Sequence, residues 1–147
     1  MVNTSTSVSL GLTITDLENL IFKNIQNNND NVISSGEIGS DCAAIEIGDK
    51  VVYLSTDPIT GTNNGLGKLA ININCNDIAT EGVSPMGIMI TILAPPHTKK
   101  EEIAKIMKEA QEEANKIGVS ILGGHTEITA AVNKTIISAT SIGIGEK

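Results

Sequence analysis

Apolar residues recur along this chain at two periods, about 3.6 residues and two, which predict helices and strands respectively. Residues 13–16 can cap a helix whose leucines and isoleucines return at helical spacing, and the asparagine-rich run that follows should end it. Two β-branched runs, 42–47 and 51–55, flank a Gly-Asp pair and predict a β-hairpin. A glycine-rich loop over residues 58–67 then leads into an apolar segment, 66–80, that predicts a helix.

In the second half of the chain the pattern alternates between strands and helices. Residues 98–101 have the capping-box sequence, and the apolar stripe that follows predicts an amphipathic helix ending at Gly118. The predicted strands are 87–94, 119–122 and 135–144. This order predicts an α+β (or α/β) fold with one mixed sheet of four to five strands and helices on one face. We expect residues 1–11 to form a flexible arm before a domain over residues 12–147.

The charge of the chain limits the kinds of partner that it can bind. The formal net charge is −7, all ten basic residues are lysines, and there is no arginine. A nucleic-acid groove needs clustered basic side chains, so we expect no nucleic-acid partner. An anionic ligand would have to be met by metal ions, lysines or backbone N–H groups, because the chain offers no guanidinium.

The hydropathy pattern and the cysteine content of the chain indicate the cellular compartment in which we expect it. The longest apolar runs, such as residues 87–94, are far shorter than the ~18 residues of a membrane-spanning helix. The N-terminus lacks the basic and apolar regions of a signal peptide, and two cysteines, Cys42 and Cys75, are typical of a reducing compartment. We therefore expect a cytoplasmic domain with no membrane partner, in which both cysteines belong to the core.

Polar and acidic residues cluster at the ends of predicted elements, where functional side chains are usually displayed. The clusters cover residues 39–41, 55–57, 76–77 and 123–127. A single aspartate in such a place is more often a turn former or a helix cap than a ligand. Asp77 differs, because it lies in a helix that is apolar on most sides, where a carboxylate needs a partner or a metal ion.

The same helix carries a polar stripe at i, i+4 spacing, formed by Lys68, Asn72 and Asn76. Since asparagine is a poor helix former, the stripe indicates a site or a buried polar contact, and a solvated helix face is the alternative. Gly123 and Gly124 let the backbone approach a ligand closely, although an ordinary strand-to-loop turn would use the same pair.

His125 and Glu127 would share one side of the chain if the backbone stays extended after the glycines. A hydrogen-bonded surface histidine is the alternative to a ligand at this position.

Taken in order, four segments resemble the N-terminal domain of the AIR synthase (aminoimidazole ribonucleotide synthetase) superfamily. That superfamily includes thiamine-monophosphate kinase, selenophosphate synthetase, formylglycinamidine synthase and the hydrogenase maturation carbamoyl dehydratase. The segments are GSDCAAIEI at 39–47, STDPITG at 55–61, GKLAININCNDIATEGVSPMGIMITIL at 67–93 and ILGGHTEIT at 121–129. They are most like AIR synthase-related proteins of the hydrogenase maturation factor type. The resemblance implies that domain's fold, with the second face of the sheet forming a homodimer interface.

The resemblance also implies an ATP-dependent enzyme that activates its substrate by phosphoryl transfer, with Mg²⁺ bridging the triphosphate. Carried onto this sequence, the implied metal ligands are Asp41, Asp57 and Asp77. The positions implied to contact the nucleotide are Lys68, Asn76, Gly123, Gly124, His125 and Thr126. The composition of the chain agrees with this implied metal-bound nucleotide independently of the resemblance. An acidic chain without arginine can hold a nucleotide only through cations and backbone donors. No catalytic residue is assigned.

The chain departs from the family's pattern in two respects. Relatives often carry Asp or Glu where this chain has His125, and imidazole is a poor Mg²⁺ ligand, so His125 would touch phosphate or Glu127 would compensate. Family members also carry a C-terminal domain that completes the site, whereas this chain ends at Lys147. We therefore expect an isolated domain that binds weakly and turns nothing over. A thiamine-monophosphate kinase-like phosphotransferase and a catalytically silent dimerisation or scaffold module are the two alternatives.

Overall fold

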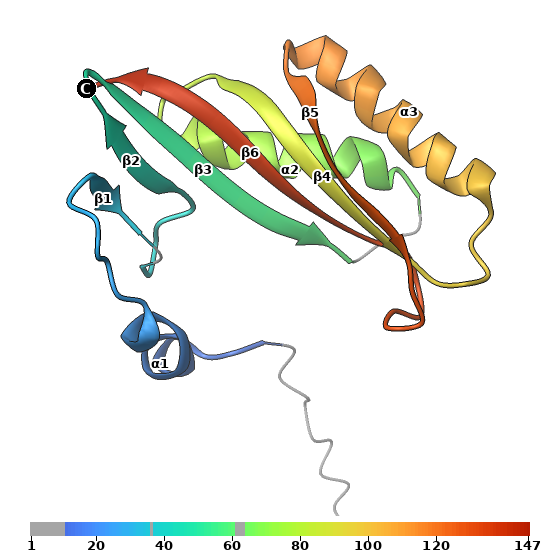
Figure 1. The fold of residues 1–147 in the computed structure, drawn as a ribbon, viewed down its shortest axis with the longest axis horizontal. Helices are drawn as coiled ribbons and strands as arrows, with labels where there is room; N and C mark the ends of the chain where they lie inside the picture. The colour runs from blue at the N-terminus through green and yellow to red at the C-terminus, as the bar shows by residue number, and fades with distance from the viewer. Residues whose placement is uncertain (1–10, 36, 61–63) are drawn as a thin grey trace, which may run out of the picture.

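The chain forms one mixed six-stranded sheet in the computed structural model, which describes residues 11–35, 37–60 and 64–147. The strands are β1 (Val32–Ser34), β2 (Ala43–Ile47), β3 (Lys50–Ile59), β4 (Pro85–Ala94), β5 (Ser120–Ile128) and β6 (Ile136–Glu146). Their order across the sheet is β1-β2-β3-β6-β4-β5; β4 and β5 are parallel, and the other neighbours are antiparallel. Two long helices, α2 (Leu66–Thr80) and α3 (Lys100–Ile117), pack on one face (Figure 1). The predicted fold class is confirmed.

The predicted hairpin is formed by β2 and β3. Ile47 pairs with Lys50 across the turn, and Gly48 between them has a φ of 65°, which glycine adopts without the strain of a side chain. The sheet has six strands rather than the predicted four to five, because β1 pairs with β2. β1 holds three residues directly after an asparagine run, too few to show a period of two in the sequence.

β3 and β5 exceed the lengths that the sequence pattern predicts by the largest margins. β3 runs to Ile59 and so takes up the first residues of the predicted loop 58–67, of which residues 61–63 lie outside the described ranges. β5 does not stop at Leu122 but continues through the two glycines to Ile128. Of the predicted N-terminal arm, residues 1–10 likewise lie outside the described residues.

The cap of α3 lies one residue later than predicted. Lys99, not Thr98, is the N-cap, and its backbone N–H donates a hydrogen bond to Glu102 Oε1 at 3.2 Å. Thr98 lies before the cap, where its own N–H closes a turn on the carbonyl of Pro95, at 3.0 Å. The helix ends as predicted at Gly118, which has a φ of 73°.

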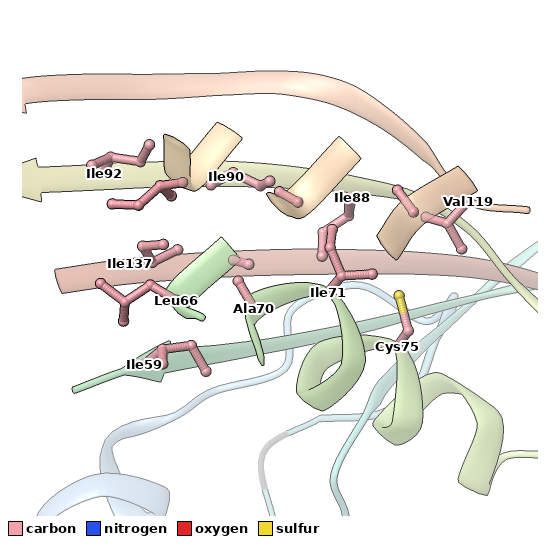
Figure 2. Close-up of a cluster of buried hydrophobic side chains, with 14 residues drawn as sticks. Ile59, Leu66, Ala70, Ile71, Cys75, Ile88, Ile90, Ile92, Val119 and Ile137 are labelled. Atoms are coloured by element: carbon pink, nitrogen blue, oxygen red, sulfur yellow. The ribbon is translucent and has the colours of Figure 1, made fainter. Parts of the chain in front are cut away.

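The hydrophobic core lies between the helices and the sheet (Figure 2). Alternate residues of β4 and β6 point into it, so Ile88, Ile92 and Ile137 are fully buried against Ile71 of α2. The other face of β4 is different: Met89 keeps 52% of its surface exposed, because no helix of the described residues covers that face. Within the described ranges, no helix combines the length and the apolar character needed to span a membrane.

The predicted first helix is broken into short turns that stand apart from the sheet (Figure 1). Thr13 caps it as predicted, but Ile14–Asp16 (α1) is followed by a π-helical turn, Leu17–Ile21 (η1), and a 3₁₀ turn, Phe22–Asn24 (η2). None of these turns contains a buried residue. The apolar stripe that predicts this helix therefore adds nothing to the core of the domain.

Candidate functional site

Three aspartates from separate elements lie in one region of the domain. Asp41 lies two residues before β2, Asp57 lies near the end of β3, and Asp77 lies in the last turns of α2. Burial, a hydrogen bond to the Asp77 side chain, and the negative charges of Asp77 and Asp41 together raise the pKa of Asp57. The three carboxylates that the family resemblance implies as metal ligands are thus near enough for their charges to interact, and their role as ligands stays a prediction.

Side-chain contacts fix this cluster to the fold. Ser55 Oγ, buried on β3, donates a hydrogen bond to Asp77 Oδ2 at 2.7 Å. The backbone N–H of Asp57 donates to Asn74 Oδ1 of α2 at 2.8 Å. The Cys42 thiol donates to the backbone carbonyl of Asp77 at 3.3 Å, which ties the start of β2 to the same helix. The positions of the carboxylates are therefore set by contacts among β2, β3 and α2.

Both cysteines are buried, as predicted from the sequence. Burial raises the pKa of the Cys75 thiol to about 11. Burial, together with the negative charges of Glu81, Asp77 and Asp41, raises the pKa of the Cys42 thiol to about 11. Only the thiolate is a good nucleophile or metal ligand, so neither cysteine has the properties of a reactive group.

The three carboxylates do not form a complete metal site by themselves. Among the described residues, no group of three or more His, Cys, Asp or Glu side chains is placed to hold a metal ion. No lysine of the described ranges pairs with Asp41, Asp57 or Asp77. The uncompensated oxygen ligands fit a hard divalent cation such as Mg²⁺, which usually keeps several waters and takes further ligands from its substrate.

The two glycines of β5 continue the strand instead of turning it. Gly123 and Gly124 have φ values of 138° and 150°, and a Cβ on Gly124 would lie 1.7 Å from the carbonyl oxygen of Ile90. Glycine is thus required at position 124 by the close approach of β4. Because the strand stays extended, His125 and Glu127 share a side as predicted, with His125 Nε2 3.7 Å from Glu127 Oε2.

Within one chain, the glycine-histidine segment and the carboxylates lie apart. β5 is separated from β3 by β6 and β4, three strand spacings or about 14 Å. The registers also put them on opposite faces: Asp57 shares the helix-covered side with Ser55, whereas His125 pairs with Thr91 on the uncovered side. Thr126 pairs with Ile92 and so faces the helix-covered side, at the exposed edge of the sheet.

The polar stripe of α2 is directed mainly at the other helix. Asn72 Nδ2 donates a hydrogen bond to Glu113 Oε1 of α3 at 3.1 Å, and Lys68 Nζ lies 4.0 Å from Glu113 Oε2. The stripe is thus partly the polar contact between helices that the sequence leaves open. Lys68 is nine residues before Asp77, which places it about 13 Å away along the helix axis. Asn76, by contrast, directly precedes Asp77 and is exposed.

A cavity of about 430 Å³ lies away from the aspartates, between the first turns of α2 and α3 and the β5–β6 connection. It is lined by His97, Lys105 and Lys134 together with Glu102 and Glu109. None of the three aspartates lines it, and its charges are mixed in sign. The cavity therefore adds nothing to the carboxylate site.

Asn74 is the residue of this region that sequence reasoning misses. It is completely buried, and its side chain holds the backbone of Asp57. The available signal is an amide in the apolar half of α2, between Ala70 and Ile78, where a polar group requires a hydrogen-bond partner.

Fold and site together define a domain that presents a carboxylate cluster beside a helix-covered mixed sheet. Residues 39–145 match the model of one protein family, "AIR synthase related protein, N-terminal domain", and the chain belongs to that family.

Relatives and a solved structure agree with this assignment. A protein of Methanocaldococcus jannaschii named for hydrogenase expression and formation is 29% identical over 136 residues, which cover 89% of this chain and 41% of that protein. Thiamine-monophosphate kinase of Mycobacterium tuberculosis is 27% identical over 114 residues, covering 71% of this chain and 33% of the enzyme. AaThiL, solved with AMPPCP and TMP, matches 77% of this chain and 38% of its own, with a TM-score of 0.67 and 21% identity. The chain spans less than half the length of these relatives.

Proposed function

We propose that this chain is the nucleotide-binding and dimerising N-terminal domain of an ATP-dependent synthetase or kinase that activates its substrate by phosphoryl transfer. The observation that carries the proposal is that Asp41, Asp57 and Asp77 lie near one another and have no lysine partner among the described residues. Burial, together with the Asp77 and Asp41 carboxylates, raises the pKa of Asp57, and a bound cation would relieve the repulsion between the ionised groups. Family membership and a thiamine-monophosphate kinase relative support the class of reaction.

In this proposal Asp57 and Asp77 hold Mg²⁺, and Asp41 contributes directly or through water. The cation supplies charge neutralisation of the triphosphate during phosphoryl transfer. Ser55 and Asn74 keep the two carboxylates in place, so the protein contributes position rather than a reactive group of its own. The fold of AaThiL, which holds AMPPCP, is compatible with a nucleotide beside this sheet.

The proposal includes a homodimer formed by the uncovered face of the sheet. Cross-strand partners on that face include Leu54 with Ile142, and Thr140 with both Thr56 and Met89. This mixture of apolar and hydroxyl side chains is suited to burial against a second copy. A second copy could also bring the Gly123–Thr126 segment to carboxylates that it does not reach within one chain.

Sedimentation equilibrium tests the homodimer. We expect a dimer at micromolar concentration and its dissociation in Met89→Glu, which places a charge on the uncovered face. Lys108→Glu on the exposed side of α3 is the matched control and should leave the dimer intact. A monomeric wild type would contradict this part of the proposal.

One alternative function has an observation in its favour. His125 is a poor Mg²⁺ ligand, and the described residues contain no group of three or more His, Cys, Asp or Glu side chains that could hold a metal ion, as a silent dimerisation or scaffold module would allow. A thiamine-monophosphate kinase-like activity shares the proposed site and differs in substrate, so binding of ATP does not separate it from the main proposal.

Thermal unfolding with ATP, with and without Mg²⁺, separates the nucleotide-binding domain from the scaffold. Ligand at ~100 times its dissociation constant should stabilise the fold by about 2.7 kcal/mol, several degrees for a domain of this size. We expect the shift to require Mg²⁺ and to disappear in Asp57→Asn and Asp77→Asn. Asp49→Asn, in the hairpin turn, makes the same charge change outside the cluster and should retain it. No shift at millimolar ATP would favour the scaffold.

A further inference from the structure

Asn74 occupies an unusual position for a helix residue, since it is completely buried in an otherwise apolar layer. Its side chain is fully used: Nδ2 donates to the carbonyl of Ala70 at 2.9 Å, and Oδ1 accepts the backbone N–H of Asp57 at 2.8 Å. Reversing the amide would place a donor against the N–H and an acceptor against the carbonyl, so one orientation alone satisfies both contacts.

The partner of that amide oxygen is a strand residue that has a neighbouring strand on one side only. β2 pairs with β3 as far as Ala43 and Leu54, and beyond this point no strand of the described residues pairs with the side of β3 away from β6. Asp57 is therefore held by β6 on one side and by Asn74 on the other. The buried amide takes the place of a neighbouring strand at the residue that carries the carboxylate.

The contact also ties the carboxylates to each other. Asp77 lies three residues after Asn74 in α2, and Ser55 lies two residues before Asp57 on β3, with Ser55 Oγ 2.7 Å from Asp77 Oδ2. Two hydrogen bonds thus join β3 to α2 beside the two carboxylates, one from Ser55 to Asp77 and one from Asp57 to Asn74. Ser141 Oγ of β6 donates to the Asn74 backbone carbonyl at 2.5 Å, which holds this turn of α2 on the sheet.

We infer that Asn74 is the positioning residue of the proposed cation site: its amide fixes the backbone of Asp57 so that the Asp57 and Asp77 carboxylates face one cation together. The inference rests on the proposed function. Asn74 does not touch the cation or the nucleotide; it acts through Asp57, as outer partners of metal ligands generally do.

The test compares Asn74→Leu, which keeps the branched shape of the side chain and removes both its acceptor and its donor, with Ser141→Ala. Asn74→Leu loses two buried hydrogen bonds and Ser141→Ala loses one at the same turn of α2, but the Ser141 hydroxyl bonds the backbone of Asn74 rather than that of Asp57. Binding of Mn²⁺ to the chain without ATP, which would itself chelate the ion, is the readout and is followed by the electron paramagnetic resonance signal of free Mn²⁺. We expect binding to weaken about 10–100-fold in Asn74→Leu and to change less than about twofold in Ser141→Ala. Asn74→Ala serves as a second variant if Asn74→Leu does not fold.

A measurement on the wild type is independent of any variant. The Asp57 amide should be strongly protected from hydrogen exchange, as expected for a bond to a buried acceptor. Fast exchange at Asp57 would overturn the inference, as would equal Mn²⁺ affinity in wild type and Asn74 variants. Absence of Mn²⁺ binding in the wild type itself would instead refute the proposed function, and the inference with it.

Discussion

Alanine at Gly124 and alanine at Gly123 are chemically identical changes one residue apart, yet they should have very different costs. A Cβ at position 124 would lie 1.7 Å from the carbonyl oxygen of Ile90, whereas ordinary contact begins at 3.4 Å. β5 would have to move away from β4 by about 1.7 Å, more than a strand-to-strand hydrogen bond can stretch. A Cβ at position 123 has nothing within 4 Å.

The losses of stability expected for Gly123→Ala and Gly124→Ala differ in magnitude. Both residues have positive φ values, 138° and 150°, so either alanine brings backbone strain of about 1–2 kcal/mol. Gly124→Ala adds the displacement of β5 from β4, for which overpacking in a close contact suggests about 1–3 kcal/mol more. For a domain of this size that difference corresponds to about 3–10 °C in Tm.

Urea and thermal unfolding of the two variants and the wild type measure this difference directly. We expect the midpoint of unfolding to order as wild type, Gly123→Ala, Gly124→Ala. Equal losses in the two variants would refute the reasoning, because they would mean that β5 does not approach β4 at Gly124 as the structure describes.

Two further predictions concern groups with perturbed pKa values. Because the pKa of Asp57 is raised in the fold, its contribution to stability is present at low pH and is lost as the pH rises through the folded-state pKa. Without metal, Asp57→Asn should therefore be more stable than the wild type at pH 7, and this gain in stability should shrink toward about pH 4. Urea unfolding midpoints measured across this pH range test the prediction. Equal stability of the wild type and the variant at pH 7 would contradict it. Cys42 and Cys75, with pKa values near 11, should alkylate at least about a hundredfold more slowly in the fold than in urea, as mass spectrometry of iodoacetamide-treated protein would show; equal rates would contradict their burial.

The elements that the sequence predicts well carry their signals locally. α2 begins and ends at the predicted residues, Leu66 and Thr80, because glycines flank the apolar segment on both sides. β5 is mispredicted for the opposite reason. Gly123 and Gly124 have the local signature of a turn, whereas the requirement for glycine at position 124 comes from β4, thirty-four residues earlier at Ile90.

The candidate site was likewise predictable from the sequence only in part. Each aspartate can be nominated from its place at an element end, but their convergence depends on β3 packing against α2. His125 and Asp57 can both be nominated too, and the sequence does not indicate that the register of β4 and β5 puts them on opposite faces. Asn74 is missed because the sequence shows only a poor helix former, and its value lies in a contact with a distant strand.

The central claim is that Asp57 and Asp77 hold the cation that carries the nucleotide. Mn²⁺ broadens the NMR signals of nearby nuclei, so amide spectra of the chain recorded with ATP and increasing Mn²⁺ locate the ion. We predict that the amides of Asp41, Asp57 and Asp77 broaden first and that Asp57→Asn abolishes the effect. Broadening centred on the glutamates of α3, with these three amides unchanged, would contradict the claim.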